Sequence, residues 1–171
     1  MALTLVLTLI CIAGVFLMLF AAVAFIQDKK YFGTAPKDEL ELIQVHEERF
    51  PGMHILGYIL GVVAIAVIAG SVVIAVWDGI QRGYGFLQFF IRILIMLEGY
   101  KIWDMLFLDN YLLTKSNFFK HYYPEIEGCE SLKKSGRDLY NFKEQILKLF
   151  MIFPAVSLAV AGLCVLIKNW I

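Results

Sequence analysis

The residues of this sequence that could take part in chemistry are charged side chains within an apolar segment. Residues 86–113 form a stretch long enough to cross a bilayer as a helix. The charged residues inside it are Arg92, Glu98, Lys101, Asp104 and Asp109. A carboxyl group in a low-dielectric environment can change its protonation state, and proton-coupled carriers use such a group near the middle of the membrane. Glu98 is the candidate for that chemistry.

Charge inside hydrocarbon is too costly to remain unpaired, so this segment needs partners for its ionised side chains. The thirteen Leu, Ile, Phe and Val residues from Phe86 to Asp109 contribute roughly −6 kcal/mol to insertion, whereas each central charge costs about +2.5 to +3.5 kcal/mol. Three such charges cancel the apolar gain. We therefore expect these residues to face one another or a neighbouring helix.

Helical spacing indicates which of these charges can meet. Glu98 with Lys101, and Lys101 with Asp104, are i,i+3 pairs, the separation at which side chains on a helix meet. Glu98, Lys101, Asp104 and Asp109 fall on one face of the predicted helix, and together with Tyr100 they make up the predicted polar network. Arg92 lies outside this face, and its long side chain is expected to reach the nearby membrane interface.

The composition places the chain among membrane proteins. Apolar residues make up 60% of the 171 residues, more than is usual for a soluble domain. Fifteen acidic residues balance fifteen basic ones, so no overall field attracts nucleic acid. The three cysteines show no paired spacing, which argues against a disulfide framework or a zinc knuckle.

The pattern predicts an all-α fold, a four-helix transmembrane bundle in one domain over residues 1–171. The predicted spans are 3–26, 54–77, 86–113 and 149–167. Loops 27–53 and 114–148 separate them and are expected to contain short interfacial helices. Residues 78–85 are predicted to form a tight, glycine-rich turn. Pro154 is expected to kink the last span, because proline removes a backbone donor.

Small residues in the second predicted span favour close helix packing. Gly57 and Gly61 have GxxxG spacing, and Ala66 and Gly70 repeat the pattern of small residues four positions apart. A specific dimer motif is the narrower interpretation of the same residues. Small residues are common in membrane spans generally, so close packing within the chain is the first expectation.

Basic residues indicate the orientation. With four spans, loops 27–53 and 114–148 lie on one side and together carry eleven Lys and Arg residues, whereas the other side has Arg82 and Lys168. By the positive-inside rule, both long loops are cytoplasmic and both termini face outward. The expected location is the inner membrane of a bacterium. The expected partners are the lipid bilayer and a second copy of the chain or another membrane protein.

Histidines and carboxylates in the two loops raise the alternative of a divalent metal site. Imidazole nitrogens and carboxylate oxygens that converge from different segments are suitable ligands. The candidate ligands are His46, His54, His121 and Asp109, with Glu125 or Glu127. For a membrane enzyme acting on a lipid headgroup, the catalytic candidates are Asp104, Asp109 and His121. Histidines at an interface are more often simply the polar ends of helices.

Sequence patterns for nucleotide chemistry and for serine hydrolysis do not occur. No GxGxxG after a strand, no GxSxG elbow and no Walker sequence is found. The spacing His46-Glu47-Glu48 also differs from the HExxH spacing that places two imidazoles on one helix face. The remaining classes are a structural or accessory membrane protein, a proton-coupled or ion transporter acting as an oligomer, and the metal-dependent membrane enzyme.

Three short stretches resemble a group of small four-span bacterial membrane proteins for which no activity is known. They are the runs 103–109 (WDMLFLD), 116–125 (SNFFKHYYPE) and 48–52 (ERFPG). The resemblance covers about half of the chain, and its motif is the pair of acids Asp104 and Asp109. It implies a bacterial inner-membrane location and the pairing of these two acids, and no catalytic role.

Overall fold

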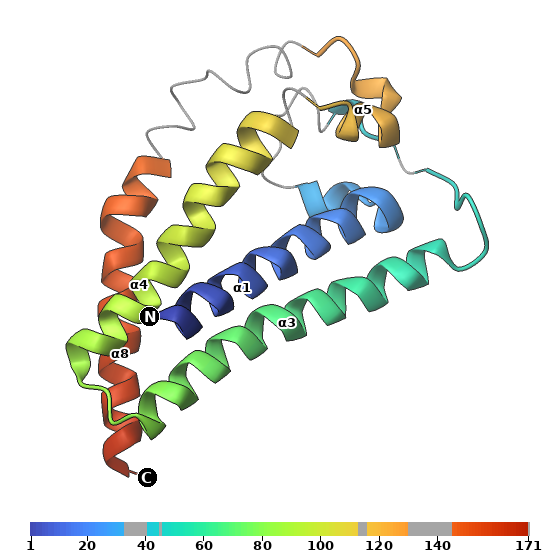
Figure 1. The fold of residues 1–171 in the computed structure, drawn as a ribbon. Helices are drawn as coiled ribbons and strands as arrows, with labels where there is room; N and C mark the ends of the chain where they lie inside the picture. Colours follow the sequence, from blue (N-terminus) through green and yellow to red (C-terminus); the bar gives the residue numbers. More distant parts are fainter. Residues whose placement is uncertain (33–40, 45, 113–115, 130–144, 171) are drawn as a thin grey trace. The chain divides into compact units, whose positions relative to one another are not determined.

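The computed structural model describes residues 1–32, 41–44, 46–112, 116–129 and 145–170, without the side chains of 32, 109 and 110, and these ranges contain helices and no strand (Figure 1). The long helices are α1 (Ala2–Phe20), α3 (Met53–Gln81), α4 (Phe86–Trp103) and α8 (Phe153–Trp170). The π-helical segments are η1 (Ala21–Ile26), η3 (Asp104–Leu112) and η5 (Lys148–Ile152). The short helices are η2 (Lys29–Phe32), α5 (Phe118–Tyr122) and η4 (Pro124–Ile126).

Three helical segments are long and apolar enough to cross a membrane, judged by length and composition: Ala2–Ile26, Met53–Gln81 and Gln145–Trp170. They lie at the predicted spans 3–26, 54–77 and 149–167. Their apolar side chains are largely exposed to the surroundings rather than packed inside the protein. A surface of this kind is unfavourable in water and suits contact with lipid. The chain therefore has the helices of a membrane protein.

The remaining predicted span, 86–113, is helical over the described residues but does not belong to this set. Helix α4 is followed directly by η3, so the backbone is helical from Phe86 to Leu112. Its charged residues separate it from the three apolar segments. The helical part of the prediction is confirmed, whereas the crossing of the membrane stays a prediction.

The prediction of a turn over residues 78–85 is wrong for its first half, because residues 78–81 are helical. Helix α3 continues to Gln81, so Asp78 is a helical residue. The helix ends in a Schellman motif, in which the N–H of Tyr84 donates to the Gly79 carbonyl (2.9 Å) and the N–H of Gly83 donates to the Ile80 carbonyl (3.0 Å). Gly83 has a φ of 69°, a conformation that glycine adopts without steric cost. The helix begun by the apolar residues therefore continues through the polar residues that follow them.

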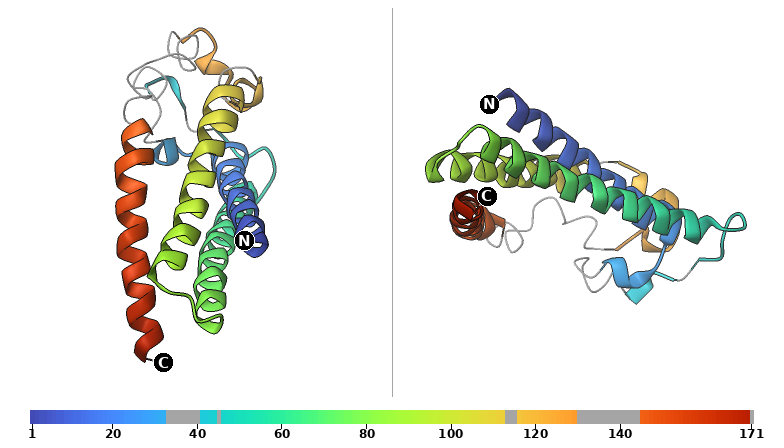
Figure 2. Two further views of the ribbon diagram at one scale, coloured as in Figure 1. Left: turned by 60° about the vertical axis from the view of Figure 1, so that its left-hand side comes forward. Right: turned by 90° about the horizontal axis from the view of Figure 1, so that it is seen from below.

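The chain divides into two compact units, which we describe separately. The first unit comprises 1–13, 66–103 and 139–171, and the second comprises 14–65 and 104–138. In the first unit, α4 and α8 lie side by side in both views (Figures 1 and 2). Phe89, Ala161 and Cys164 form the core between these helices.

The amino-terminal part of α1 also packs in the first unit. Leu7, Ala75 and Met96 form a small buried cluster that joins α1, α3 and α4. A Cβ atom added to Gly99 would lie 2.8 Å from Cγ2 of Thr8, so glycine permits α1 and α4 to approach closely at this point.

The second unit contains a close contact at one of the glycines in the predicted packing pattern. A Cβ atom at Gly57 would lie 2.8 Å from Cβ of Phe25 and 2.7 Å from Cγ1 of Ile26. Gly61 has open space around it. Close packing thus occurs at Gly57, and the second half of the GxxxG pair does not take part in it. The short helices η2, α5 and η4 are present in the loops, as predicted, and their position at a membrane interface stays a prediction.

Pro154 lies at the start of α8 rather than within a regular helix. The π-helical segment η5 precedes it directly. A π-helical turn accommodates the missing backbone donor of proline by changing the hydrogen-bonding pattern locally.

Gly79→Ala should destabilise the protein by about 1–3 kcal/mol, the usual cost of overpacking. A Cβ atom at this position would clash with the ring of Phe89, which is fully buried and has no space to move into. Gly70→Ala in the same helix is the matched control, because its Cβ would meet nothing within 4 Å. The free energy of unfolding in mixed micelles measures both, and equal effects would contradict the packing described here.

Candidate functional site

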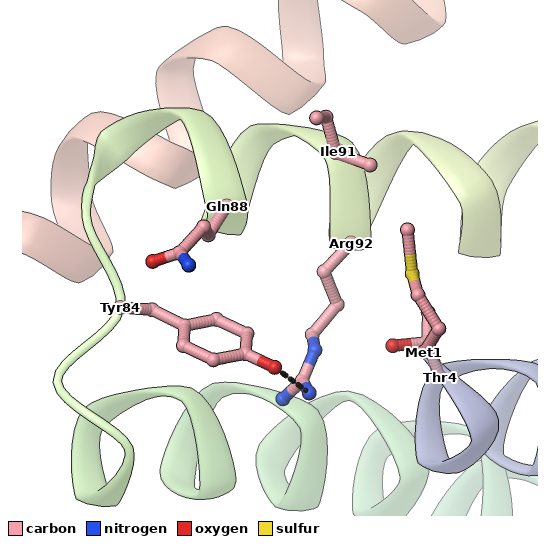
Figure 3. Close-up of a pocket in the computed structure, with 6 residues that line it drawn as sticks. All are labelled: Met1, Thr4, Tyr84, Gln88, Ile91 and Arg92. Carbon is pink, nitrogen blue, oxygen red and sulfur yellow. Dashed lines mark hydrogen bonds between the residues drawn. The ribbon is translucent and has the colours of Figure 1, made fainter.

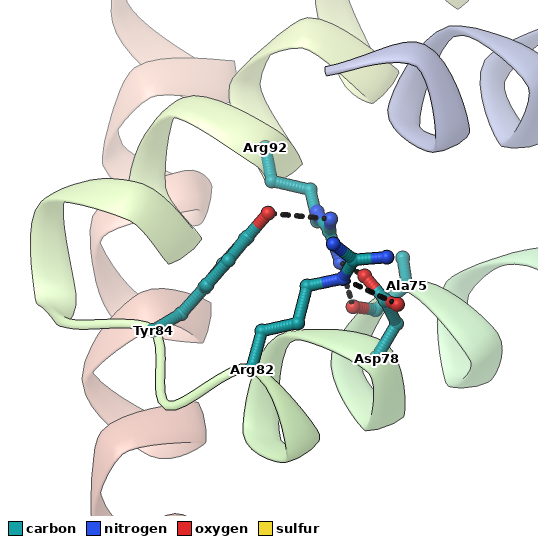
Figure 4. Close-up of polar contacts among 5 residues, drawn as sticks. All are labelled: Ala75, Asp78, Arg82, Tyr84 and Arg92. Carbon is teal, nitrogen blue, oxygen red and sulfur yellow. Dashed lines mark hydrogen bonds and ion pairs between the residues drawn. The ribbon is translucent and has the colours of Figure 1, made fainter.

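Arg92 is the centre of a set of polar contacts among the described residues of the first unit. Its side chain is only 3% exposed, so the protein encloses it, and its expected reach to the membrane interface stays a prediction. Nη1 lies 2.9 Å from Oδ2 of Asp78 and donates to the Ala75 carbonyl at 2.7 Å. Nη2 donates to the hydroxyl of Tyr84 at 3.0 Å (Figure 4). The guanidinium is therefore held by an acid, a carbonyl and a phenol instead of by solvent.

The turn between α3 and α4 brings these groups together. Asp78 lies seven residues before Gly85, and Arg92 lies seven residues after it. Two helices joined by a short turn place such positions at similar depths, so the acid and the base can meet. Gly85 directly precedes α4, and its N–H donates to Oε1 of Gln88 at 2.9 Å, as in a capping box.

Tyr84 holds Arg92 from a second direction. The Cζ atom of Arg92 lies 4.5 Å from the centroid of the Tyr84 ring, within the range of a cation–π interaction. The same ring makes an edge-to-face contact with Phe89, at a centroid distance of 5.9 Å. The core residue Phe89 thus positions the aromatic ring that contacts the buried cation.

Two further cations lie at this turn. Arg82 donates from Nε to Oδ1 of Asp78 at 2.8 Å, and its side chain is 60% exposed. Lys168, near the end of α8, donates from Nζ to the carbonyls of Gly83 (2.9 Å) and Tyr84 (3.0 Å). The three cations at this turn are Arg82, Arg92 and Lys168. Asp78 is the one acid that contacts them among the described residues, so two positive charges are not balanced. We call this set, with Asp78 and Tyr84, the turn cluster.

A cavity of about 170 Å³ adjoins the turn cluster (Figure 3). It is lined by Met1, Thr4, Tyr84, Gln88, Ile91 and Arg92. Figure 3 shows the Tyr84 ring extending toward the guanidinium of Arg92. The Nε atom of Arg92 is buried and has no hydrogen-bond partner among the described residues. The lining is therefore apolar on one side and carries an unused cationic donor on the other.

The structure gives the positions of the predicted polar network without testing it. Lys101 is buried in α4, and Glu98 and Tyr100 are partly buried in the same helix. Asp104 begins η3 and is also partly buried. No hydrogen bond or ion pair joins Glu98 to another described residue. Asp109 lies in η3, and its side chain is outside the described part. The network stays a prediction.

The three histidines make separate contacts in the second unit. His46 and Glu125 are 2.8 Å apart, His54 and Glu48 are 3.4 Å apart, and the His121 ring contacts the ring of its neighbour Tyr122. Within the described residues, no group of three or more His, Cys, Asp and Glu side chains could hold a metal ion. Asp109 is outside that search, so the metal site formed by His46, His54, His121 and Asp109 stays a prediction.

Glu125 joins two loop segments that are distant in the sequence. Its Oε1 accepts from Nε2 of His46 and, at 3.3 Å, from the backbone N–H of Gln44. An ionised carboxylate only accepts hydrogen bonds, so Nε2 of His46 is the donor. Burial alone would raise the pKa of Glu125, but the hydrogen bonds from His46 and Gln44 outweigh it and lower the pKa. The ring of the fully buried Tyr123 packs against His46.

Glu48 stabilises the start of α3 in a similar way. Its carboxylate accepts the N–H groups of Gly52 (3.0 Å) and His54 (3.2 Å), which lower its pKa. Free N–H groups at the start of a helix favour a negative charge, so this contact defines where α3 begins.

These arrangements bind charge rather than present a reactive group. The turn cluster neutralises a buried cation and offers excess positive charge, and the Glu125–His46 pair orients an imidazole within a loop. Comparison of the whole chain with family models, with curated proteins and with solved structures finds no match. Function must therefore be argued from the site itself.

Sequence reasoning missed the pairing of Asp78 with Arg92. It placed Asp78 in a turn and Arg92 at an interface, because hydropathy treats each segment separately. The equal spacing of these two residues on either side of Gly85 was the signal that could have found the pair. Tyr84 had no signal of its own, since its role depends on where the turn directs its ring.

Asp78→Asn should lower the melting temperature of the purified protein by roughly 10 °C, because it leaves Arg92 buried without a counter-charge. Arg82→Gln is the control, since it removes an exposed partner of the same acid and should change the melting temperature by no more than about 2 °C. Thermal unfolding in detergent, followed by circular dichroism, measures both. A smaller effect for Asp78→Asn than for Arg82→Gln would show that the pair is not required.

Acid should loosen the loop that contains His46 before it unfolds the helices. The pKa of Glu125 and that of Glu48 are both lowered in the folded protein, so their stabilisation is complete above the unfolded value near 4.5 and is lost as pH falls through the lower folded values. Hydrogen exchange of residues 41–53 should increase below about pH 4. Glu125→Gln should show the increase already at pH 7, whereas Glu127→Gln, in an exposed position, should not.

Proposed function

We propose that this chain is a structural or accessory integral membrane protein in which α4 and η3 form a fourth crossing. The assignment to membrane proteins rests on three helices that are long and apolar enough to cross a membrane. The proposal of a fourth crossing rests on the environment of α4. This helix packs along α8 through the cluster of Phe89, Ala161 and Cys164, so one of its faces is covered by an apolar helix.

The observation that carries the proposal is the buried pair of Arg92 and Asp78. A single charge near the centre of a membrane helix costs about 2.5–3.5 kcal/mol on insertion scales. Arg92 avoids most of this cost, because its guanidinium contacts Asp78 of α3 and its side chain is only 3% exposed. A charged helix that satisfies its cation within the protein can enter a bilayer with its neighbours. This supports a crossing by α4 despite its unfavourable composition.

The orientation of the proposed bundle follows from its basic residues. Loops 27–53 and 114–148 face the cytoplasm, and both termini face outward. The location we propose is a bacterial inner membrane. Lys101, Asp104 and their neighbours then form a polar site near the cytoplasmic half of the fourth crossing, as the network hypothesis holds.

Glu98 supports the accessory role in particular. It is partly exposed near the middle of the helical segment from Phe86 to Leu112, and no described residue pairs with it. An acid at this depth requires a partner, and a polar group from another membrane helix would provide one. We therefore include in the proposal a second copy of the chain, or another membrane protein, that contacts α4 at Glu98.

The same observation favours one alternative, a proton-coupled or ion transporter acting as an oligomer. A carboxyl group at this depth can carry a proton, and four helices are few for a pathway within one chain. Reconstituted vesicles distinguish the two functions. Flux that disappears in Glu98→Gln supports transport. A folded wild-type protein that shows no flux, and whose partner complex weakens in Glu98→Gln, supports the accessory role with a partner at Glu98.

Single cysteines at Gln81 and Lys120 should react with a membrane-impermeant thiol reagent from opposite sides of the membrane. Gln81 precedes the α3–α4 turn and Lys120 follows η3, and both side chains are exposed, so the labelling reports whether the segment between them crosses. The background for both variants replaces Cys11, Cys129 and Cys164 with serine. Labelling of both positions from the same side would show that α4 and η3 do not cross.

A further inference from the structure

The turn cluster has more positive charge than its own structure uses. Asp78 is the one acid that contacts it among the described residues, and it is shared by Arg82 and Arg92. Lys168 is bound only to backbone carbonyls, so its full charge remains. The amino-terminal end of α4 carries partial positive charge and the carboxyl-terminal ends of α3 and α8 carry partial negative charge, so the excess comes from the side chains and not from the helix dipoles. Excess charge of this kind attracts an anion.

A buried donor of Arg92, one of the residues that line the cavity, also lacks an acceptor. Nε of Arg92 is buried without a hydrogen-bond partner among the described residues, and the side chain of Arg92 lines the cavity of about 170 Å³. A buried N–H without an acceptor costs free energy, so an oxygen atom that enters the cavity is favoured. Gln88 provides a further donor, because its Oε1 is used by Gly85 and its amide nitrogen remains.

The donors at this site suit a phosphate group. A phosphate oxygen accepts several hydrogen bonds at once and carries the negative charge that the cluster lacks. Arginine binds this group well because its N–H donors lie in one plane. A water molecule would satisfy Nε of Arg92 but would leave the excess charge of Arg82 and Lys168 unchanged. The combination therefore favours an anion over water.

The position of the cluster along the helices indicates the source of the phosphate. It lies where the apolar segments Met53–Gln81 and Gln145–Trp170 end. In the membrane protein that we propose above, and on which this step rests, helix ends lie at the depth of lipid headgroups. In the orientation proposed above the α3–α4 turn faces outward, so basic residues at this depth contact lipid headgroups of the outer leaflet.

We propose that the turn cluster and its adjoining cavity bind the phosphate group of an anionic phospholipid. The phosphate contacts Nε of Arg92 and the amide of Gln88 in the cavity, and the charges of Arg82 and Lys168 increase its affinity. Free inorganic phosphate has the same chemistry, so the test includes it as a separate ligand.

Native mass spectrometry of the full-length protein in detergent tests this proposal. The protein is titrated with phosphatidylglycerol, with phosphatidylcholine and, separately, with inorganic phosphate. We expect preferential binding of phosphatidylglycerol. Arg82→Gln and Lys168→Gln should each weaken it about fivefold, the factor that one basic residue contributes near an anionic surface. Lys120→Gln, an exposed position in the second unit, is the matched control and should leave binding unchanged.

Arg92→Lys tests the buried donor directly. It keeps a cation near Asp78 and removes Nε, so it should weaken binding of both phospholipids, because both carry the phosphate group, while the protein still folds. If this variant does not fold, the variants Arg82→Gln and Lys168→Gln still test the site. Binding of inorganic phosphate without a preference among lipids would support the same site with a soluble ligand.

Two results would overturn the proposal. The first is no preference for phosphatidylglycerol over phosphatidylcholine together with no binding of inorganic phosphate, which would leave water as the occupant of the cavity. The second is an equal loss in Lys120→Gln, which would show general charge attraction. Resistance of the same samples to alkaline extraction from membranes tests the membrane location separately, so failure of this site and failure of the proposed function are distinguishable.

Discussion

A cation that is withdrawn from solvent must be neutralised by the protein, and this constraint organises the first unit. Arg92 meets it through Asp78, Ala75 and Tyr84, which come from α3 and from the turn that follows. The contact requires α3 to continue past the end of its apolar residues, so that Asp78 is held by helical backbone. It also requires Phe89 to pack against Gly79, because the ring of Phe89 supports Tyr84. The helix end, the turn and the core thus depend on one charge.

The units differ in how they use acidic residues. In the first unit, Asp78 offsets a cation within the protein. In the second unit, Glu48 and Glu125 accept backbone N–H groups and contact histidines, so they connect loop segments to each other. Loops of this kind carry few apolar contacts, and carboxylates provide the specific bonds that shape them.

Much of the fold could be predicted from the sequence, because long apolar runs have few alternatives to helices. The predicted spans 3–26, 54–77 and 149–167 correspond to helical segments whose ends differ by a few residues. Hydropathy could not determine which charges pair, since pairing depends on how two segments lie against each other. Arg92 and Asp78 show this limit, as each was given a local explanation. Gly57 shows the reverse, because a local pattern predicted close packing and the structure has it.

Lys168 has a consequence for the order in which the protein is made. It binds the carbonyls of Gly83 and Tyr84 although it is 85 and 84 residues away from them in the chain. The ribosome therefore completes the α3–α4 hairpin well before it synthesises the residue that fastens it. Until then the hairpin is held by its own hydrogen bonds and by the attraction between Asp78 and Arg92. The hydrogen bonds from Lys168 form only when α8 packs against the hairpin, so these contacts of the turn require the complete chain.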